Sequence, residues 1–181
     1  MNFPEIPSQE HAMQASLPAY SYMPLQAPYS GYRIPLNENS TFPPALHPFS
    51  YDADGVSPIF IGSAILPSSV HPCKIVPALD PKCMFPYGGR EHHHRGRYDL
   101  LPFDANTMEC VPTSHGQIPA GRRPVGGGYE DNGNKLYHGI ATVGGVRVPG
   151  KTGPHLGGCN VSFAGQEHII HENYDILCWK F

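Results

Sequence analysis

One long segment of the sequence occurs twice, and this internal repeat constrains the fold more than any other feature. Residues 151–179 resemble residues 74–101, with identical or similar residues at an offset of 77 before a one-residue gap and of 76 after it. Self-similarity at a fixed period predicts two copies of one supersecondary unit of about 75 residues. Two copies are too few for an open solenoid, so we expect them to pack on each other as one pseudo-symmetric domain. The matching pairs include Phe60 and Tyr137, Gly62 and Gly139, Ala64 and Ala141, Pro72 and Pro149, Lys74 and Lys151, Cys83 and Cys159, Gly89 and Gly165, Glu91 and Glu167, His92 and His168, Tyr98 and Tyr174, Asp99 and Asp175, and Leu101 and Leu177.

Both copies contain short apolar runs that favour strands over helices. Residues 58–64 have an aromatic and β-branched bias and are bounded by turn residues, and Tyr98 and Leu100 alternate with their neighbours as in a strand. No window shows a convincing helical period, and the 20 Gly and 21 Pro residues favour turns. We therefore predict an all-β fold, an antiparallel β-sandwich built from two pseudo-symmetric tandem repeats with a Pro-rich N-terminal tail.

The predicted organisation has three parts: a Pro/Tyr-rich flexible tail over residues 1–42, a diverged first repeat over 43–103 and a second repeat over 104–181, the two repeats forming one domain. Frequent proline in the tail opposes both helix and central strand, because the ring fixes φ and removes the N–H. Three interpretations of the tail stay open. It is a mobile segment, partly in the polyproline II conformation, a Pro/Tyr motif that recruits a protein partner, or an arm packed on the domain.

Composition excludes several classes of function. The net charge of −3 and only 12 Lys and Arg residues give no phosphate-tracking surface, so we expect no nucleic-acid partner. No apolar run approaches the 18 or more residues that span a bilayer. The N-terminal stretch lacks the basic and apolar regions of a signal peptide, and we expect the five cysteines to be reduced. The expected location is cytoplasmic, with export by a route without a signal peptide left open.

The second copy carries a specific set of motifs. In order they are residues 110–112 (CVP), 115–121 (HGQIPAG), 126–128 (GGG), 136–139 (LYHG), 149–151 (PGK), 165–168 (GQEH) and 174–177 (YDIL). In order and spacing they resemble the DM9 repeat, also called the DUF3421 domain. The first copy resembles a more diverged DM9 repeat, mainly through its second half. The resemblance covers roughly residues 43–179.

The resemblance implies an all-β, non-enzymatic sugar-binding module similar to mannose-binding DM9 lectins and to the lectin-like part of natterin-like proteins. In the mannose-binding members, an acidic residue after the GG turn and the Lys of the PGK element hold the ligand. Carried onto this chain, these are Lys151 with Glu130 in the second repeat, where Asp131 competes with Glu130. In the first repeat they are Lys74 with Asp52 or Asp54. The first copy has Cys73 where the PGK element has Gly, which would be strained if that position required a positive φ.

A lysine and a carboxylate together suit a sugar ligand. The ammonium only donates and the carboxylate only accepts, so the pair fixes two adjacent hydroxyls through charge-assisted bonds. Two pseudo-equivalent sites, or a homodimer, would raise a weak affinity through multivalency. The structural alternative for both lysines is a salt bridge at a strand end.

Other residues could suggest a metal site or a nucleophile, but we expect no catalytic residue, cofactor or metal. His92, His93 and His94 are consecutive and cannot all face one ion from a strand. Glu91 and Glu167 recur beside His92 and His168, and we expect these carboxylates to accept backbone N–H bonds at the adjacent turns. The equivalent Cys83 and Cys159 are expected to be small buried residues, since no paired base is evident.

We therefore predict a lectin-like protein that recognises mannose-type glycans, as in innate defence or surface recognition. The alternative is an intracellular interaction or scaffold protein that keeps the fold without sugar binding and acts through its tail.

Overall fold

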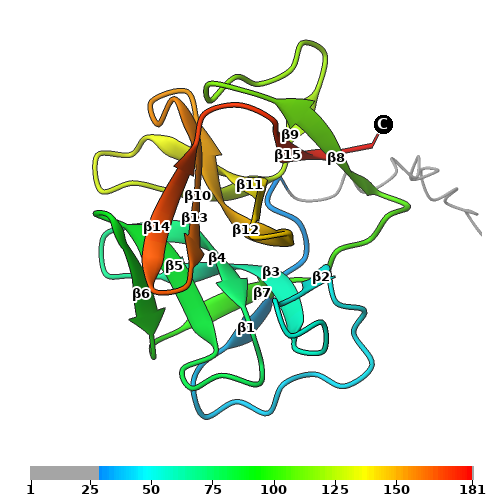
Figure 1. Cartoon of the computed structure of the whole chain (residues 1–181), viewed down its shortest axis with the longest axis vertical. Coiled ribbons are helices and arrows are strands. Elements are labelled where there is room, and N and C mark those ends of the chain that lie inside the picture. Colours follow the sequence, from blue (N-terminus) through cyan, green and yellow to red (C-terminus); the bar gives the residue numbers. More distant parts are fainter. Residues whose placement is uncertain (1–28, 181) are drawn as a thin grey trace, which may run out of the picture.

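The computed structural model describes residues 29–180, which form fifteen strands and no helix (Figure 1). All strand pairs are antiparallel, so the prediction of an antiparallel all-β fold is confirmed. Within residues 29–180 no segment qualifies as a membrane-spanning helix. The strands are β1 (Ile34–Leu36), β2 (Ser50–Tyr51), β3 (Pro58–Ile65), β4 (Val70–Ile75), β5 (Cys83–Tyr87), β6 (Arg90–His94), β7 (Tyr98–Leu101), β8 (Met108–Thr113), β9 (Arg123–Pro124), β10 (Gly126–Tyr129), β11 (Lys135–Val143), β12 (Val146–Gly153), β13 (Gly158–Phe163), β14 (Gln166–Ile170) and β15 (Tyr174–Trp179).

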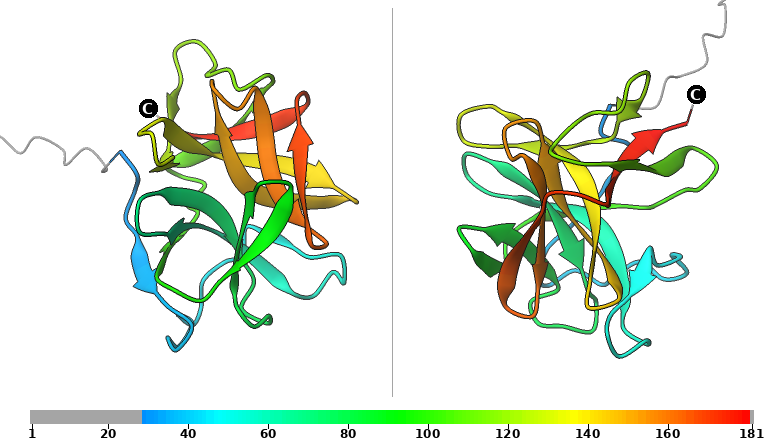
Figure 2. Two further views of the ribbon diagram at one scale, coloured as in Figure 1. Left: turned by 90° about the vertical axis from the view of Figure 1, so that its left-hand side faces the viewer. Right: turned by 45° about the horizontal axis from the view of Figure 1, so that its top comes forward.

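The two repeats have the same strand order. In the first, β3 lies between β4 and β7, and β5 and β6 continue outward from β4; in the second, β11 lies between β12 and β15, and β13 and β14 continue outward from β12. Figure 1 and the left view of Figure 2 show the first repeat, in blue, cyan and green, below the second, in yellow-green to red. The internal repeat of the sequence is therefore a repeat of topology.

Hydrogen bonds connect the two repeats into one sheet rather than two separate layers. β6 pairs with β14 at Arg90 and Gln166, and β10 pairs with both β11 and β4. These two junctions close a barrel-like ring of strands that runs β4, β5, β6, β14, β13, β12, β11 and β10. Closure of this kind removes exposed sheet edges from the centre of the molecule.

The first repeat begins earlier in the chain than we predicted. We assigned residues 1–42 to a flexible tail; residues 1–28 lie outside the described residues, but 29–42 include β1, which pairs with β7. Pro35 lies opposite Asp99, just as Pro112 of β8 lies opposite Asp175, so β1 is the equivalent of β8. Pro35 and Pro112 also match at the offset of 77, a signal hidden by the proline-rich composition around it.

Arg33 holds this N-terminal arm on the domain. Its guanidinium donates to the Ser63 hydroxyl at 3.1 Å and to the Gly126 carbonyl at 2.7 Å, and it lies 2.9 Å from Nε2 of buried His138. Burial lowers the pKa of Arg33 to about 10. The arm therefore contacts both repeats, in agreement with the third interpretation of the tail.

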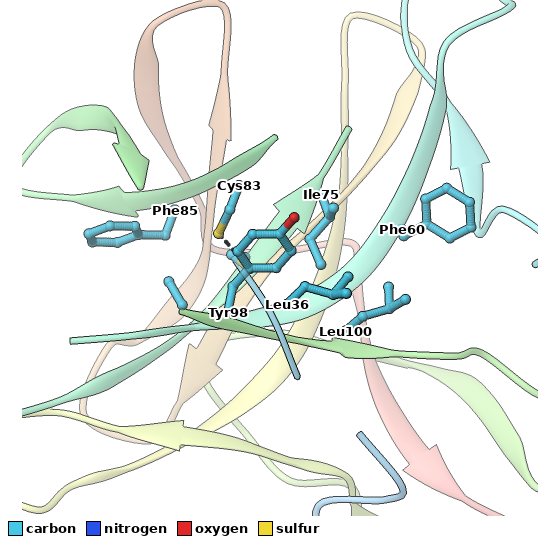
Figure 3. Close-up of a cluster of buried hydrophobic side chains, with 9 residues drawn as sticks. Leu36, Phe60, Ile75, Cys83, Phe85, Tyr98 and Leu100 are labelled. Atoms are coloured by element: carbon cyan, nitrogen blue, oxygen red, sulfur yellow. Dashed lines mark hydrogen bonds between the residues drawn. The ribbon is translucent and has the colours of Figure 1, made fainter. Parts of the chain in front are cut away.

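The core consists of alternate side chains from both repeats. One cluster belongs to the first repeat and surrounds Tyr98, with Leu36, Phe60, Ile75, Cys83, Phe85 and Leu100 (Figure 3). A second cluster lies between the repeats and combines Ile59, Val76 and Met84 with side chains of β11 to β15 such as Val148 and Val161. Since neither repeat covers these apolar faces alone, burial of the shared cluster favours the closed arrangement.

The glycine run 126–128 permits the close approach of β10 to β4. A Cβ on Gly127 would lie 2.5 Å from Cγ of Pro72, and one on Gly128, whose φ is +154°, would lie 1.9 Å from the carbonyl oxygen of Val70. The run is thus a packing requirement of the junction between the repeats.

We predict that Gly128→Ala destabilises the protein by about 1–3 kcal/mol, because the added methyl overpacks the backbone of β4. Urea denaturation would measure this. Gly55→Ala is the matched control, since Gly55 also has a positive φ, +68°, but open space around it. Equal losses in the two variants would show that the close approach does not matter.

Candidate functional site

Lys151, in the middle of β12, is a buried cation at the rim of an open pocket. Only 2% of the residue is exposed. Its ammonium lies 3.2 Å from Oε1 of Glu130, 3.2 Å from Nδ1 of His71 and 4.9 Å from the centre of the Tyr87 ring. Glu130 follows β10, whereas His71 and Tyr87 belong to the first repeat. The site is therefore built by both repeats.

The cavity around this cluster has a volume of about 410 Å³, and we call it the Lys151 pocket. This volume is within the range of small-molecule sites. The lining residues are Tyr87, Gly88, Glu130, Asp131, Asn132, Lys151, His155, Leu156, Asn160 and Glu167.

His71 acts as a neutral acceptor beside the ammonium. Burial, with the nearby Lys151 charge, lowers the pKa of His71 to about 4. Because an ammonium only donates, Nδ1 of His71 accepts and Nε2 carries the proton, facing the Ser69 hydroxyl at 3.1 Å. Lys151 thus uses two of its three donors on His71 and Glu130, and the third is left for the aromatic face of Tyr87 or for a ligand.

Asn160 of β13 lies directly opposite Lys151 in the strand register. Its amide nitrogen donates to Oε1 of Glu167 at 2.8 Å, while its buried Oδ1 has no hydrogen-bond partner among the described residues. Buried polar atoms in folded proteins are almost always paired. Within residues 29–180 the structure therefore leaves one polar atom beside Lys151 without a partner, although Oδ1 itself is buried.

The two equivalent glutamates cross between the repeats. Glu167 accepts from the backbone N–H of Gly89 at 2.6 Å, and Glu91 accepts from that of Gly165 at 3.4 Å. We expected each carboxylate to accept from the turn adjacent to it. Each accepts instead from the Gly-Gly or Ala-Gly turn of the other repeat. The equivalent His92 and His168 lie within hydrogen-bond distance of the carbonyls of Tyr87 and Phe163. All four residues therefore make contacts that hold turns or strand ends.

The pseudo-equivalent position in the first repeat is closed. Lys74 is 3% exposed, its ammonium lies 2.8 Å from Oε2 of buried Glu91 and 5.6 Å from the centre of the Phe163 ring. Phe163 is the equivalent of Tyr87, and Met84 is the equivalent of Asn160. An apolar side chain and an internal ion pair replace the polar groups of the Lys151 pocket.

Asp52 and Asp54 do not pair with Lys74, contrary to the arrangement that we expected. Both lie in the exposed connection between β2 and β3. Asp54 accepts from the backbone N–H groups of Val56 and Ser57 and from the Ser57 hydroxyl, and Asp52 accepts from the N–H of Ala53. They stabilise their own turns, and the partner of the first-repeat lysine is Glu91.

In the second repeat the structure brings together Lys151 and Glu130. Asp131 lines the same pocket but accepts from the Ser68 hydroxyl at 2.9 Å instead. Sequence reasoning missed Tyr87, Asn160, His71 and His155 as lining or supporting residues. The repeat alignment held a signal for two of them. Tyr87 aligns with Phe163 and Asn160 aligns with Met84, and in each pair the equivalent residue of the other copy is less polar.

Gly150, beside Lys151, is required for packing rather than for a positive φ. Neither Gly150 nor the equivalent Cys73 has a positive φ, so the cysteine is not strained there. A Cβ on Gly150 would lie 2.2 Å from the Asn160 carbonyl oxygen.

The cysteines of the described residues are free thiols with low reactivity. Cys73, Cys83, Cys159 and Cys178 are buried, and burial raises the pKa of Cys178 to about 11 and those of Cys83 and Cys159 well above the ordinary value. Nucleophilic attack requires the thiolate. No group of His, Cys, Asp and Glu side chains with the geometry of a metal site occurs within residues 29–180.

A sequence model of the DM9 repeat family matches residues 52–170. Among solved structures, the fold is similar to that of the nematode sperm cell motility protein MFP2B, with a TM-score of 0.60 and 15% sequence identity. The match covers 99% of this chain and 53% of that one, so the chain spans about half the length of MFP2B. A comparison with curated proteins finds no match.

We predict that Lys74→Met destabilises the fold by about 3–5 kcal/mol, because Glu91 would remain as an unpaired buried charge. The double variant Lys74→Met/Glu91→Gln should recover most of this loss. Urea denaturation of the wild type and both variants measures the effect. A single variant as stable as the wild type would contradict the closed ion pair.

We also predict that His71 makes stability depend on pH. Its folded pKa, about 4, is below the ordinary 6.5, so between these values the unfolded state binds the additional proton. Stability should therefore fall on acidification from pH 6.5 to 4, by roughly 1–3 kcal/mol from this residue. His71→Gln keeps an acceptor for Lys151 and should reduce the slope of unfolding free energy against pH. An unchanged slope would contradict the assignment.

Proposed function

This chain belongs to the DM9 repeat family, and we propose that it is a lectin-like protein that binds mannose-type glycans in the Lys151 pocket. The observation that carries the proposal is the convergence of the Lys151 ammonium and the Glu130 carboxylate, 3.2 Å apart, at an open cavity. Adjacent hydroxyls of one sugar can accept from the ammonium and donate to the carboxylate. Such charge-assisted bonds are stronger than neutral ones.

The charge of the pocket favours a neutral ligand. Lys151 is accompanied by Glu130, Asp131 and Glu167, so carboxylates outnumber the lysine. A phosphate or an acidic sugar would be repelled, whereas a neutral sugar meets acceptors and donors at short range. The choice of mannose among neutral sugars rests on the resemblance of the Lys and acid positions to those of mannose-binding DM9 lectins.

Binding rather than catalysis fits these groups. The buried thiols have raised pKa values, and His71 is held neutral as an acceptor for Lys151. Because the Lys74 position is closed by Glu91, we propose one glycan site per chain, and multivalent binding would then require association of chains.

A second candidate function is an interaction protein that has the fold without sugar binding. The structural likeness to a nematode sperm cell motility protein favours it, because that protein is described by a role in cell motility. In this case the segment before residue 29 would recruit the partner. Deletion of residues 1–28 separates the two functions, because a lectin should keep its glycan and an interaction protein should lose its partner.

We predict that the protein binds immobilised mannan, that free mannose elutes it, and that Lys151→Ala and Glu130→Gln each weaken binding at least about tenfold through loss of a charge-assisted bond. Titration calorimetry with a soluble mannoside should give one site per chain.

Asp54→Asn is the matched control for this experiment, because it changes the carboxylate considered for the first repeat, and it should bind as the wild type does. Thermal denaturation of each variant confirms folding. A wild type that ignores a broad glycan panel would refute the proposed function, and equal losses in Glu130→Gln and Asp54→Asn would refute the site.

A further inference from the structure

A second cavity adjoins the Lys151 pocket. Its volume is about 280 Å³, and it shares Tyr87 and Asp131 with the Lys151 pocket. We call it the aromatic pocket, after the side chains in its wall. It is lined by Leu66, Pro67, Ser68, Ser69, His71, Phe85, Tyr87, His92 and Asp131.

The wall of the aromatic pocket is a row of stacked rings. Phe85 lies between His71 and His92, with ring centres 5.4 and 5.3 Å apart and planes tilted by only 21° and 23°. Tyr87 stands edge-on to both histidines, at 78° and 76°. The result is an apolar surface next to the charged groups of the Lys151 pocket.

Tyr87 links the two cavities. It is 48% exposed, its ring lies 4.9 Å from the Lys151 ammonium, and it lines both pockets. Asp131, the other shared residue, is held by the Ser68 hydroxyl from the β3–β4 connection. A ligand that contacts Lys151 and Glu130 therefore reaches the aromatic pocket by extending past Tyr87.

The chemistry of the two pockets differs in a way that suits two linked sugar residues. The Lys151 pocket offers ionic donors and acceptors for hydroxyls, while the aromatic pocket offers the exposed rings of Tyr87 and His92, against which the C–H face of a pyranose is removed from water. The Asp131 carboxylate at its border can accept from one of the remaining hydroxyls.

We propose that the aromatic pocket is a second sugar subsite, so that the ligand of this protein is an oligosaccharide of at least two units rather than a monosaccharide. This inference rests on the proposed function, because it assigns the first unit to the Lys151 pocket. In the first repeat the equivalent lysine is paired with Glu91 instead.

Calorimetric titration of the full chain with methyl α-mannoside, with α-linked mannobioses and with mannotriose tests the proposal. The wild type should bind at least one mannobiose about tenfold more tightly than the monosaccharide. Ser68→Trp, at an exposed position in the β3–β4 connection, should fill the aromatic pocket. It should remove this gain and leave monosaccharide affinity unchanged.

Ser68→Ala is the matched control, because it removes the bond to Asp131 without filling the aromatic pocket, and it should keep the gain. His92→Ala provides a second variant and should reduce the gain by shortening the row of rings. Equal affinities for one and two sugar units in the wild type, or equal losses for both ligands in Ser68→Trp, would overturn the second subsite alone. Absence of binding to every mannoside would overturn the proposed function with it.

Discussion

The reciprocal connection between the two Gly-containing turns joins the two repeats where β6 meets β14. Glu167 accepts from the N–H of Gly89, and Glu91 accepts from that of Gly165, while β6 and β14 pair beside them. These bonds place Tyr87, at the end of β5, over Lys151 of the second repeat. They likewise place Phe163, at the end of β13, over Lys74 of the first repeat. Neither repeat therefore has a complete lysine environment by itself, and the candidate site depends on correct association of the halves.

The two repeats have the same strand order, but the side chains around their equivalent lysines differ. Both lysines are almost fully buried and both lie near an aromatic ring. Lys74 is satisfied by Glu91, whereas Glu167 bonds to Asn160, which leaves Lys151 to Glu130 and His71. Asn160 of the second repeat is equivalent to Met84 of the first. Glu167 can therefore accept from an amide, whereas the equivalent Glu91 has no such donor at position 84 and pairs with Lys74. Lys74 is enclosed in an ion pair with Glu91, whereas Lys151 and Glu130 line the Lys151 pocket.

Closure of the sheet also constrains residues that do not line the candidate site. The glycine run 126–128 lets β10 lie against β4, and the same strand leads directly to Glu130. Arg33 of the N-terminal arm bonds to the carbonyl of Gly126 and thereby fixes this strand from outside. Packing at this junction determines where the carboxylate of the site lies, so structural and functional requirements meet on β10.

The sequence by itself determined the repeat, the antiparallel all-β class and the family, because these depend on local pattern and on a fixed offset. The resemblance to the family also pointed to Lys151 with Glu130 or Asp131, and the structure places Glu130 beside the lysine. It did not determine that Glu91 neutralises Lys74, that Asp52 and Asp54 stabilise only their own turns, or that residues 29–42 belong to the first repeat. Those outcomes depend on which side chains meet across the interface of the two copies. His71 and Tyr87 enter the site from the other repeat, 80 and 64 positions from Lys151, and only the tertiary structure brings them there.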